Sequence, residues 1–108
     1  MSGERFTTKL VRDRIPEIAK DKGETVVTRM ADESEYRDAL MIKLHEEVGE
    51  LVNGGRTDEE IADILEVLQT IARERGVSWQ RILHYQRGKR ITKGGFDQRI
   101  MMKVPLHS

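Results

Sequence analysis

Hydrophobic residues recur every three or four positions in two long segments in the middle of the chain. The first segment carries such positions from Leu40 to Leu51, and the second from Ile61 to Ala72. This spacing places the apolar side chains on one face of a helix. Each segment opens with the form of a capping box and closes at glycine. We predict a first helix that starts near Asp32 or Ser34 and stops at Gly54-Gly55, and a second that starts at Thr57 and stops at Gly76.

Shorter elements flank these two helices. A third helix is expected to start at Ser78 and to run to about Gly88. A short helix is expected before the long ones, with Asp13 as its cap, Pro16 in its first turn and Gly23 at its end. Residues 25–30 are β-branched and weakly alternating, which predicts either a short strand or an extended link.

Short connections between long helices favour antiparallel neighbours. We therefore predict an all-α fold, in which residues 1–108 form one domain with an antiparallel helical hairpin and further short helices. Hydrophobic residues make up 37% of the chain and charged residues 35%. Such helices bury their apolar stripes against other subunits as well as within one chain. A homo-oligomeric helical bundle, dimer or tetramer, is expected.

Charge and composition exclude several classes of protein. The formal net charge is zero, whereas a general nucleic-acid binder is basic. The absence of cysteine excludes disulfides and cysteine-based zinc sites. No apolar run approaches the roughly 20 residues of a membrane span, and the N-terminus lacks the apolar region of a signal peptide. We expect a cytoplasmic protein with neither nucleic acid nor membrane as a partner.

The candidate chemistry lies in two acidic pairs, Glu47 with Glu50 and Glu60 with Asp63. Spacing at i, i+3 puts both carboxylates of a pair on one helix face. On a helical wheel, each pair falls to the same rotational side of its apolar stripe, within about two turns of the connecting loop. In an antiparallel hairpin the four carboxylates therefore converge on one groove.

Four close carboxylates repel one another unless a cation joins them. A site of oxygen ligands alone suits a hard cation, Mg²⁺ first and Mn²⁺ second. The alternative is that these acids belong to the solvated surface, with Glu60 serving as the capping partner of Thr57. Two basic clusters are candidates for phosphate contacts or, alternatively, for solvated faces. They comprise Lys9, Arg12 and Arg14, and Lys89, Arg90 and Lys93.

Together these motifs resemble the all-alpha nucleoside triphosphate pyrophosphohydrolases, which include MazG-like proteins, dimeric dUTPases and phosphoribosyl-ATP pyrophosphohydrolases. The chain is most similar to the small phosphoribosyl-ATP pyrophosphohydrolase-like branch, and the similarity spans nearly its whole length. The matching segments are KLVRDRIP at residues 9–16, EIADILEVL at residues 60–68, and Lys89-Arg90 with KGGF at residues 93–96.

The resemblance implies that Glu47, Glu50, Glu60 and Asp63 bind Mg²⁺ and carry catalysis. Glu46 and Glu66 flank them, to support the ligands or to bind an extra ion. It implies that water attack on a nucleotide releases pyrophosphate and a nucleoside monophosphate, with one carboxylate accepting the proton of the water. The substrates would be NTPs or dNTPs, including non-canonical nucleotides in a house-cleaning role.

Two alternatives remain: a phosphoribosyl-ATP pyrophosphohydrolase, or a helical oligomer that binds nucleotide or metal without turnover. The sequence leaves open which nucleotide is the substrate, how many metal ions bind, how many subunits assemble, and whether the basic clusters touch phosphate.

Overall fold

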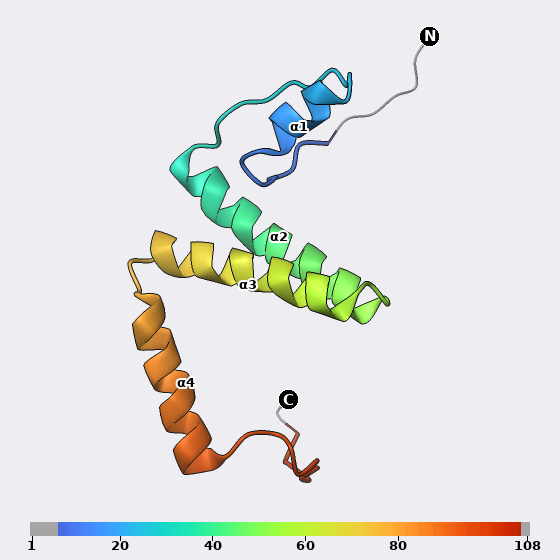
Figure 1. The fold of residues 1–108 in the computed structure, drawn as a ribbon. Coiled ribbons are helices and arrows are strands. Elements are labelled where there is room, and N and C mark those ends of the chain that lie inside the picture. Colours follow the sequence, from blue (N-terminus) through green and yellow to red (C-terminus); the bar gives the residue numbers. More distant parts are fainter. Residues whose placement is uncertain (1–6, 107–108) are drawn as a thin grey trace. The chain divides into compact units, whose positions relative to one another are not determined.

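The computed structural model describes residues 7–106, and within that range it contains four α-helices and no strand (Figure 1). The all-helical fold class is therefore confirmed, and residues 25–30 form a link rather than a strand. No helix in the described range is both long and apolar enough to cross a membrane. The helices are α1 (Ile15–Asp21), α2 (Glu33–Val52), α3 (Thr57–Glu74) and α4 (Trp79–Lys93).

The chain divides into two compact units at the boundary between Gly76 and Val77. The first unit contains α1, α2 and α3, and it holds both acidic pairs. The second contains α4, which carries the second basic cluster, and the segment that follows this helix. Each unit is described separately below.

Side-chain caps start two of the helices where the sequence predicts them. The Asp32 carboxylate accepts a hydrogen bond from the Glu35 backbone N–H at 2.8 Å, which satisfies one free donor at the start of α2. Ser78 accepts from the Arg81 N–H at 3.2 Å and starts α4 in the same way. However, α4 continues to Lys93, past the predicted end near Gly88, because glycine weakens a helix without ending it.

The other predicted caps are wrong. Arg14 rather than Asp13 precedes α1, and Arg56 rather than Thr57 precedes α3, in both cases without a side-chain cap. The Glu35 side chain does not complete a capping box, because its two oxygens accept hydrogen bonds from the Arg29 guanidinium at 2.6 Å each. The α2 start is therefore capped by Asp32 alone, without the reciprocal bond of a capping box.

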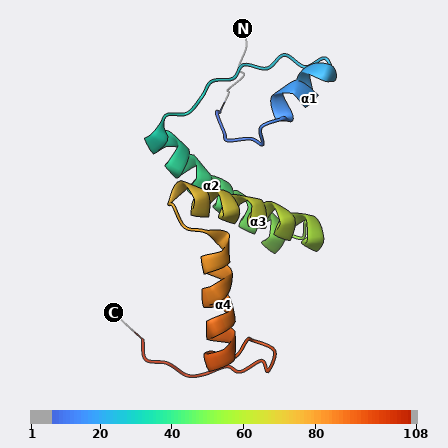
Figure 2. The ribbon, with the colours of Figure 1, turned by 60° about the vertical axis from the view of Figure 1, so that its left-hand side comes forward.

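The two long helices pack against each other and are joined by residues 53–56 (Figures 1 and 2). Near the start of α2, Leu40 and Met41 line a small cavity with Ile71, which belongs to the second half of α3. Near its end, the Glu47 carboxylate approaches those of Glu60 and Asp63 in the first half of α3. This pairing of opposite halves places the acidic residues beside the connection.

Little apolar surface is buried between these helices. Among the described residues, the buried hydrophobic side chains are those of Leu40, Val67 and Ala72. The predicted stripe on α3 is only partly covered, because Ile61, Leu65 and Leu68 remain 39–51% exposed. These three positions share one helix face, which the described part of the chain leaves about half exposed.

Candidate metal-binding site

Five carboxylates from α2 and α3 form two overlapping groups. In each group, one oxygen from every member lies within 4.8 Å of the others. One group joins Glu47 on α2 to Glu60 and Asp63 on α3; the other joins Glu46, Glu47 and Glu50 on α2. Glu47 belongs to both groups and is only 6% exposed. The structure thus brings all four sequence-predicted ligands to one place, together with Glu46, which the sequence analysis placed beside them.

Two buried oxygens in this cluster lack a hydrogen-bonding partner. Among the described residues, the buried Oε2 atoms of Glu47 and Glu60 neither accept nor donate a hydrogen bond. Buried polar atoms are nearly always satisfied in folded proteins, since leaving one unpaired costs free energy. Burial, a hydrogen bond with Glu50 and the charges of Glu50, Glu47 and Asp63 raise the pKa of Glu60 to about 7. Both features indicate more negative charge than the protein itself neutralises.

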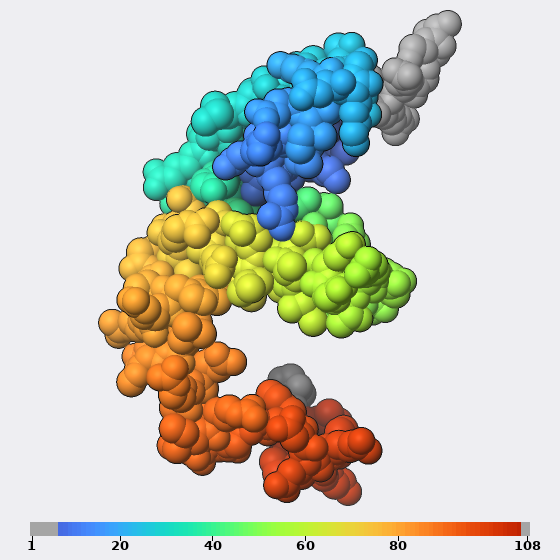
Figure 3. Space-filling view, in the orientation of Figure 1, coloured from blue at the N-terminus to red at the C-terminus, as the bar shows by residue number. Residues whose placement is uncertain are grey.

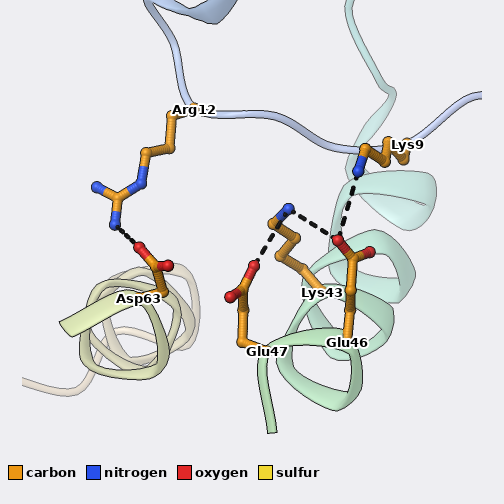
Figure 4. A network of polar contacts seen from close by, with 6 residues as sticks. All are labelled: Lys9, Arg12, Lys43, Glu46, Glu47 and Asp63. Atoms are coloured by element: carbon orange, nitrogen blue, oxygen red, sulfur yellow. Dashed lines mark hydrogen bonds and ion pairs between the residues drawn. The ribbon is translucent and has the colours of Figure 1, made fainter. Parts of the chain in front are cut away.

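Three cations of the same unit partly balance the acids (Figure 4). Lys43 on α2 lies 3.3 Å from Glu46 Oε1 and 3.4 Å from Glu47 Oε1, and its side chain is only 19% exposed. The other two come from the segment before α1. Lys9 Nζ lies 3.4 Å from the same oxygen of Glu46. Arg12 Nη2 donates to Asp63 Oδ1 at 2.7 Å.

These contacts shift the pKa values of Lys43 and Glu46. Burial lowers the pKa of Lys43, but the charges and hydrogen bonds of Glu46 and Glu47 outweigh it and raise that pKa overall. Burial raises the pKa of Glu46, but Lys43 and Lys9 outweigh it and lower that pKa overall. Glu46 therefore lies between two lysines, whereas Glu60 is crowded by other carboxylates.

Gly55 in the connection lets the Glu60 side chain fold back against the backbone. A Cβ at this position would lie 2.9 Å from Cγ and Oε1 of Glu60 and 3.0 Å from the Glu50 carbonyl oxygen. The Gly55 N–H donates to that same carbonyl at 2.9 Å. A larger residue at position 55 would therefore require the Glu60 side chain or the neighbouring backbone to shift.

The remaining predicted residues lie elsewhere. Arg14 pairs with Glu17 of α1, at 2.8 Å from Nη2. Glu66 is exposed and its nearest ionic partner is Arg73, at 3.9 Å. In the second unit, the Arg90 guanidinium lies 3.5 Å from Asp97, and a Cβ on Gly95 would meet it at 2.7 Å.

Lys89 and Lys93 lie on α4 with Arg90, and all three are exposed. These cations belong to the second unit, whereas the acids belong to the first.

Sequence reasoning missed Lys43 and Gly55. The signal for Lys43 was available, because Lys43, Glu46 and Glu47 stand at i, i+3 and i+4 and so share a helix face. Gly55 was interpreted only as a helix stop, because its close approach to Glu60 depends on the packing of two helices.

The donor set fits a divalent cation. Carboxylate oxygens without imidazole or thiolate are the ligands that Mg²⁺ and Mn²⁺ prefer. The unpaired Oε2 atoms of Glu47 and Glu60 are two such ligand atoms, provided by separate helices. A cation held between the helices would satisfy both atoms and reduce the repulsion that raises the pKa of Glu60.

Comparisons with known proteins add little. No family model matches the chain, and no solved structure matches it. An uncharacterized protein of Mycolicibacterium smegmatis (strain ATCC 700084 / mc(2)155) is 54% identical over 43 residues, which is 40% of this chain. The matched segment spans 44% of that relative's length.

Gly55→Ala is expected to weaken Mg²⁺ binding by about tenfold without altering a carboxylate, as changes one contact away from a ligand typically do. The new methyl group would push the Glu60 side chain out of the cluster. Isothermal titration calorimetry with Mg²⁺ measures the effect. Gly49→Ala is the matched control, because its methyl group meets no atom within 4 Å. That control should stabilise α2 by about 0.5–1 kcal/mol, and an equal loss of affinity in both variants would contradict the account.

Removing the charge of Glu60 should stabilise the fold at high pH, whereas removing the charge of Glu46 should destabilise it. The raised pKa of Glu60 means that its contribution to stability falls as the pH rises from its ordinary pKa of 4.5 to about 7. With a chelator present, Glu60→Gln should therefore melt above wild type at pH 8, and the difference should shrink towards pH 5. The lowered pKa of Glu46 stabilises the fold above its ordinary pKa, so Glu46→Gln should melt below wild type at pH 8.

Thermal melts of the three proteins across pH 5–8 test this contrast. If Glu60→Gln melts below wild type at pH 8, the carboxylates are not crowded in the way described.

Proposed function

We propose that this protein is a Mg²⁺-dependent nucleoside triphosphate pyrophosphohydrolase, converting an NTP or dNTP and water into a nucleoside monophosphate and pyrophosphate. Non-canonical nucleotides are the proposed substrates, in a house-cleaning role. One observation carries the proposal: one carboxylate oxygen from each of Glu47, Glu60 and Asp63 lies within 4.8 Å of the others, and Glu47 and Glu60 each have a buried, unpaired oxygen. The end motifs KLVRDRIP and KGGF, which resemble those of such hydrolases, support the choice of reaction.

Glu47, Glu60 and Asp63 are the proposed ligands of the ion, with Glu50 as the fourth. When bound, Mg²⁺ would neutralise phosphate charge and orient water, as divalent ions do in phosphoryl chemistry. The water oxygen attacks the α-phosphorus, and the bond from that phosphorus to the bridging oxygen breaks, so that pyrophosphate leaves. One carboxylate of the cluster accepts the water's proton. Glu50 is the most exposed of the four, so it is the one that solvent reaches most easily.

The proposed phosphate ligands are cationic side chains. Lys9 and Arg12 already lie within the acidic cluster, where a nucleotide bound through its metal would arrive. Arginine binds phosphate bidentately, whereas lysine acts as a point charge. Arg14 and the exposed α4 residues Lys89, Arg90 and Lys93 are proposed on the resemblance alone.

We also propose that the hairpin of α2 and α3 assembles with other copies of the chain into a helical bundle, as a dimer or tetramer. The argument is the half-exposed stripe of Ile61, Leu65 and Leu68, since exposed apolar patches mark interaction surfaces. A second copy of the same stripe is its natural cover, because two-fold assembly places identical surfaces face to face.

Leu65→Glu should therefore reduce the mass in solution towards that of a single 12.5 kDa chain, because burying a charge in the interface is unfavourable. Sedimentation equilibrium measures the mass. Val27→Glu is the control, because Val27 is 96% exposed and lies off the stripe. A wild-type mass of one chain would contradict the assembly.

Pyrophosphate release from a panel of NTPs, dNTPs, damaged nucleotides and phosphoribosyl-ATP, with and without Mg²⁺, tests the activity. Release that depends on Mg²⁺ and stops with EDTA is expected from at least one. Glu47→Gln and Asp63→Asn should lower it by more than roughly 100-fold, the upper range for changes one contact removed from a metal. Glu59→Gln is the control, since Glu59 neighbours Glu60 but pairs only with Arg56 among the described residues.

Each other result of the panel has a definite meaning. Release from phosphoribosyl-ATP alone would assign the enzyme to that substrate. Binding of nucleotide by folded protein without pyrophosphate release would identify a binding module and contradict the hydrolase.

A further inference from the structure

The segment before α1 crosses the acidic cluster and touches both helices that form it. Residues 9–12, here termed the strap, lie outside any helix. Lys9 at one end pairs with Glu46 on α2, and Arg12 at the other pairs with Asp63 on α3 (Figure 4). In the space-filling view, atoms of this blue segment reach the yellow-green surface of α3 (Figure 3). The pairs join residues 37 and 51 positions apart in the sequence.

An ion pair at each end links the strap to α2 and to α3. Leu10 is half-buried, whereas the two charged residues of the strap, Lys9 and Arg12, remain 58% and 54% exposed. Exposed ion pairs contribute little to stability, so exchanging them for other partners is inexpensive. Lys43, by contrast, is 19% exposed on α2 itself and lies between two acids of its own helix. Lys9 and Arg12 can therefore exchange their carboxylate partners at little cost, whereas Lys43 is held in place on α2.

We propose that the strap is an exchangeable counterion: Lys9 and Arg12 neutralise the acids until a divalent ion binds, and then turn to the phosphates of the nucleotide. This inference rests on the proposed function. A divalent ion brings the same two positive charges that the strap provides, so the exchange conserves the charge of the cluster. The buried, unpaired Oε2 of Glu47 remains for the incoming ion, because no strap residue bonds to it.

Arg12 carries most of this exchange. Its guanidinium lies 2.7 Å from Asp63 Oδ1, within the group that would hold the ion, so it repels a divalent cation there. Once displaced, the same guanidinium presents paired N–H donors that match a phosphate. Arg12 thus opposes binding of the metal alone and favours binding of the metal with nucleotide.

Calorimetry of Arg12→Gln with two ligands separates these effects. The ligands are Mg²⁺ alone, and Mg²⁺ with a triphosphate whose α,β-bridging oxygen is replaced by a methylene group. Mg²⁺ alone should bind the variant about two- to fivefold more tightly, as expected when one exposed ion pair no longer competes. The complex with the analogue should bind about tenfold more weakly, because a charge-assisted contact to phosphate is lost.

Arg12→Lys keeps the charge but not the paired donors. It should bind Mg²⁺ alone as wild type does, yet bind the analogue more weakly. Lys20→Gln, which removes a charge from the exposed face of α1, controls for net charge and should change neither affinity.

The outcomes also separate this inference from the proposed function. If wild type binds Mg²⁺ while Arg12→Gln binds it equally or less tightly, the strap is not a counterion and the hydrolase proposal stands. If Arg12→Gln binds Mg²⁺ more tightly but the analogue unchanged, the transfer to phosphate is wrong. If wild type binds no Mg²⁺, both proposals fail.

Discussion

Repulsion among carboxylates is the constraint on which the rest of this structure depends. Two packed helices force Glu47, Glu60 and Asp63 together, although each would be better solvated apart. Lys43 on α2 partly neutralises these carboxylates, and so do Lys9 and Arg12 from a segment distant in sequence. The pKa of Glu60 nevertheless stays near 7, so the compensation is incomplete. Such a cluster disfavours folding unless a cation joins the carboxylates, and its all-oxygen composition fits a divalent cation.

Local features of the sequence predicted most of the helical fold. Apolar spacing and the caps Asp32 and Ser78 locate the helices within a few residues, since these signals act over single turns. The spacing of the acidic pairs also predicted that the carboxylates of α2 and α3 meet. The contacts of Arg12 with Asp63 and of Gly55 with Glu60 could not be predicted in the same way, because they depend on how separate segments pack.

The same distinction explains the apolar stripe on α3. Periodicity shows that Ile61, Leu65 and Leu68 share a face, but it cannot say whether that face meets the same chain or another. In a single chain they stay about half exposed, and only three hydrophobic residues of the described range are buried. A core this small contributes little free energy of folding with which to offset the repulsion among the carboxylates. Assembly and metal binding would then stabilise the same two helices, one at the stripe and the other at the carboxylates.

The central claim, that the carboxylates of α2 and α3 hold one divalent cation between them, is tested most directly by anomalous diffraction from crystals grown with Mn²⁺. The account predicts a peak among Glu47, Glu60 and Asp63, at about 2.0–2.2 Å from their oxygens as for a small hard cation. The electron density of the same crystals would show whether Arg12 has left Asp63. Full Mn²⁺ exposure with no peak, and with Arg12 still paired to Asp63, would contradict the metal site and the hydrolase built on it.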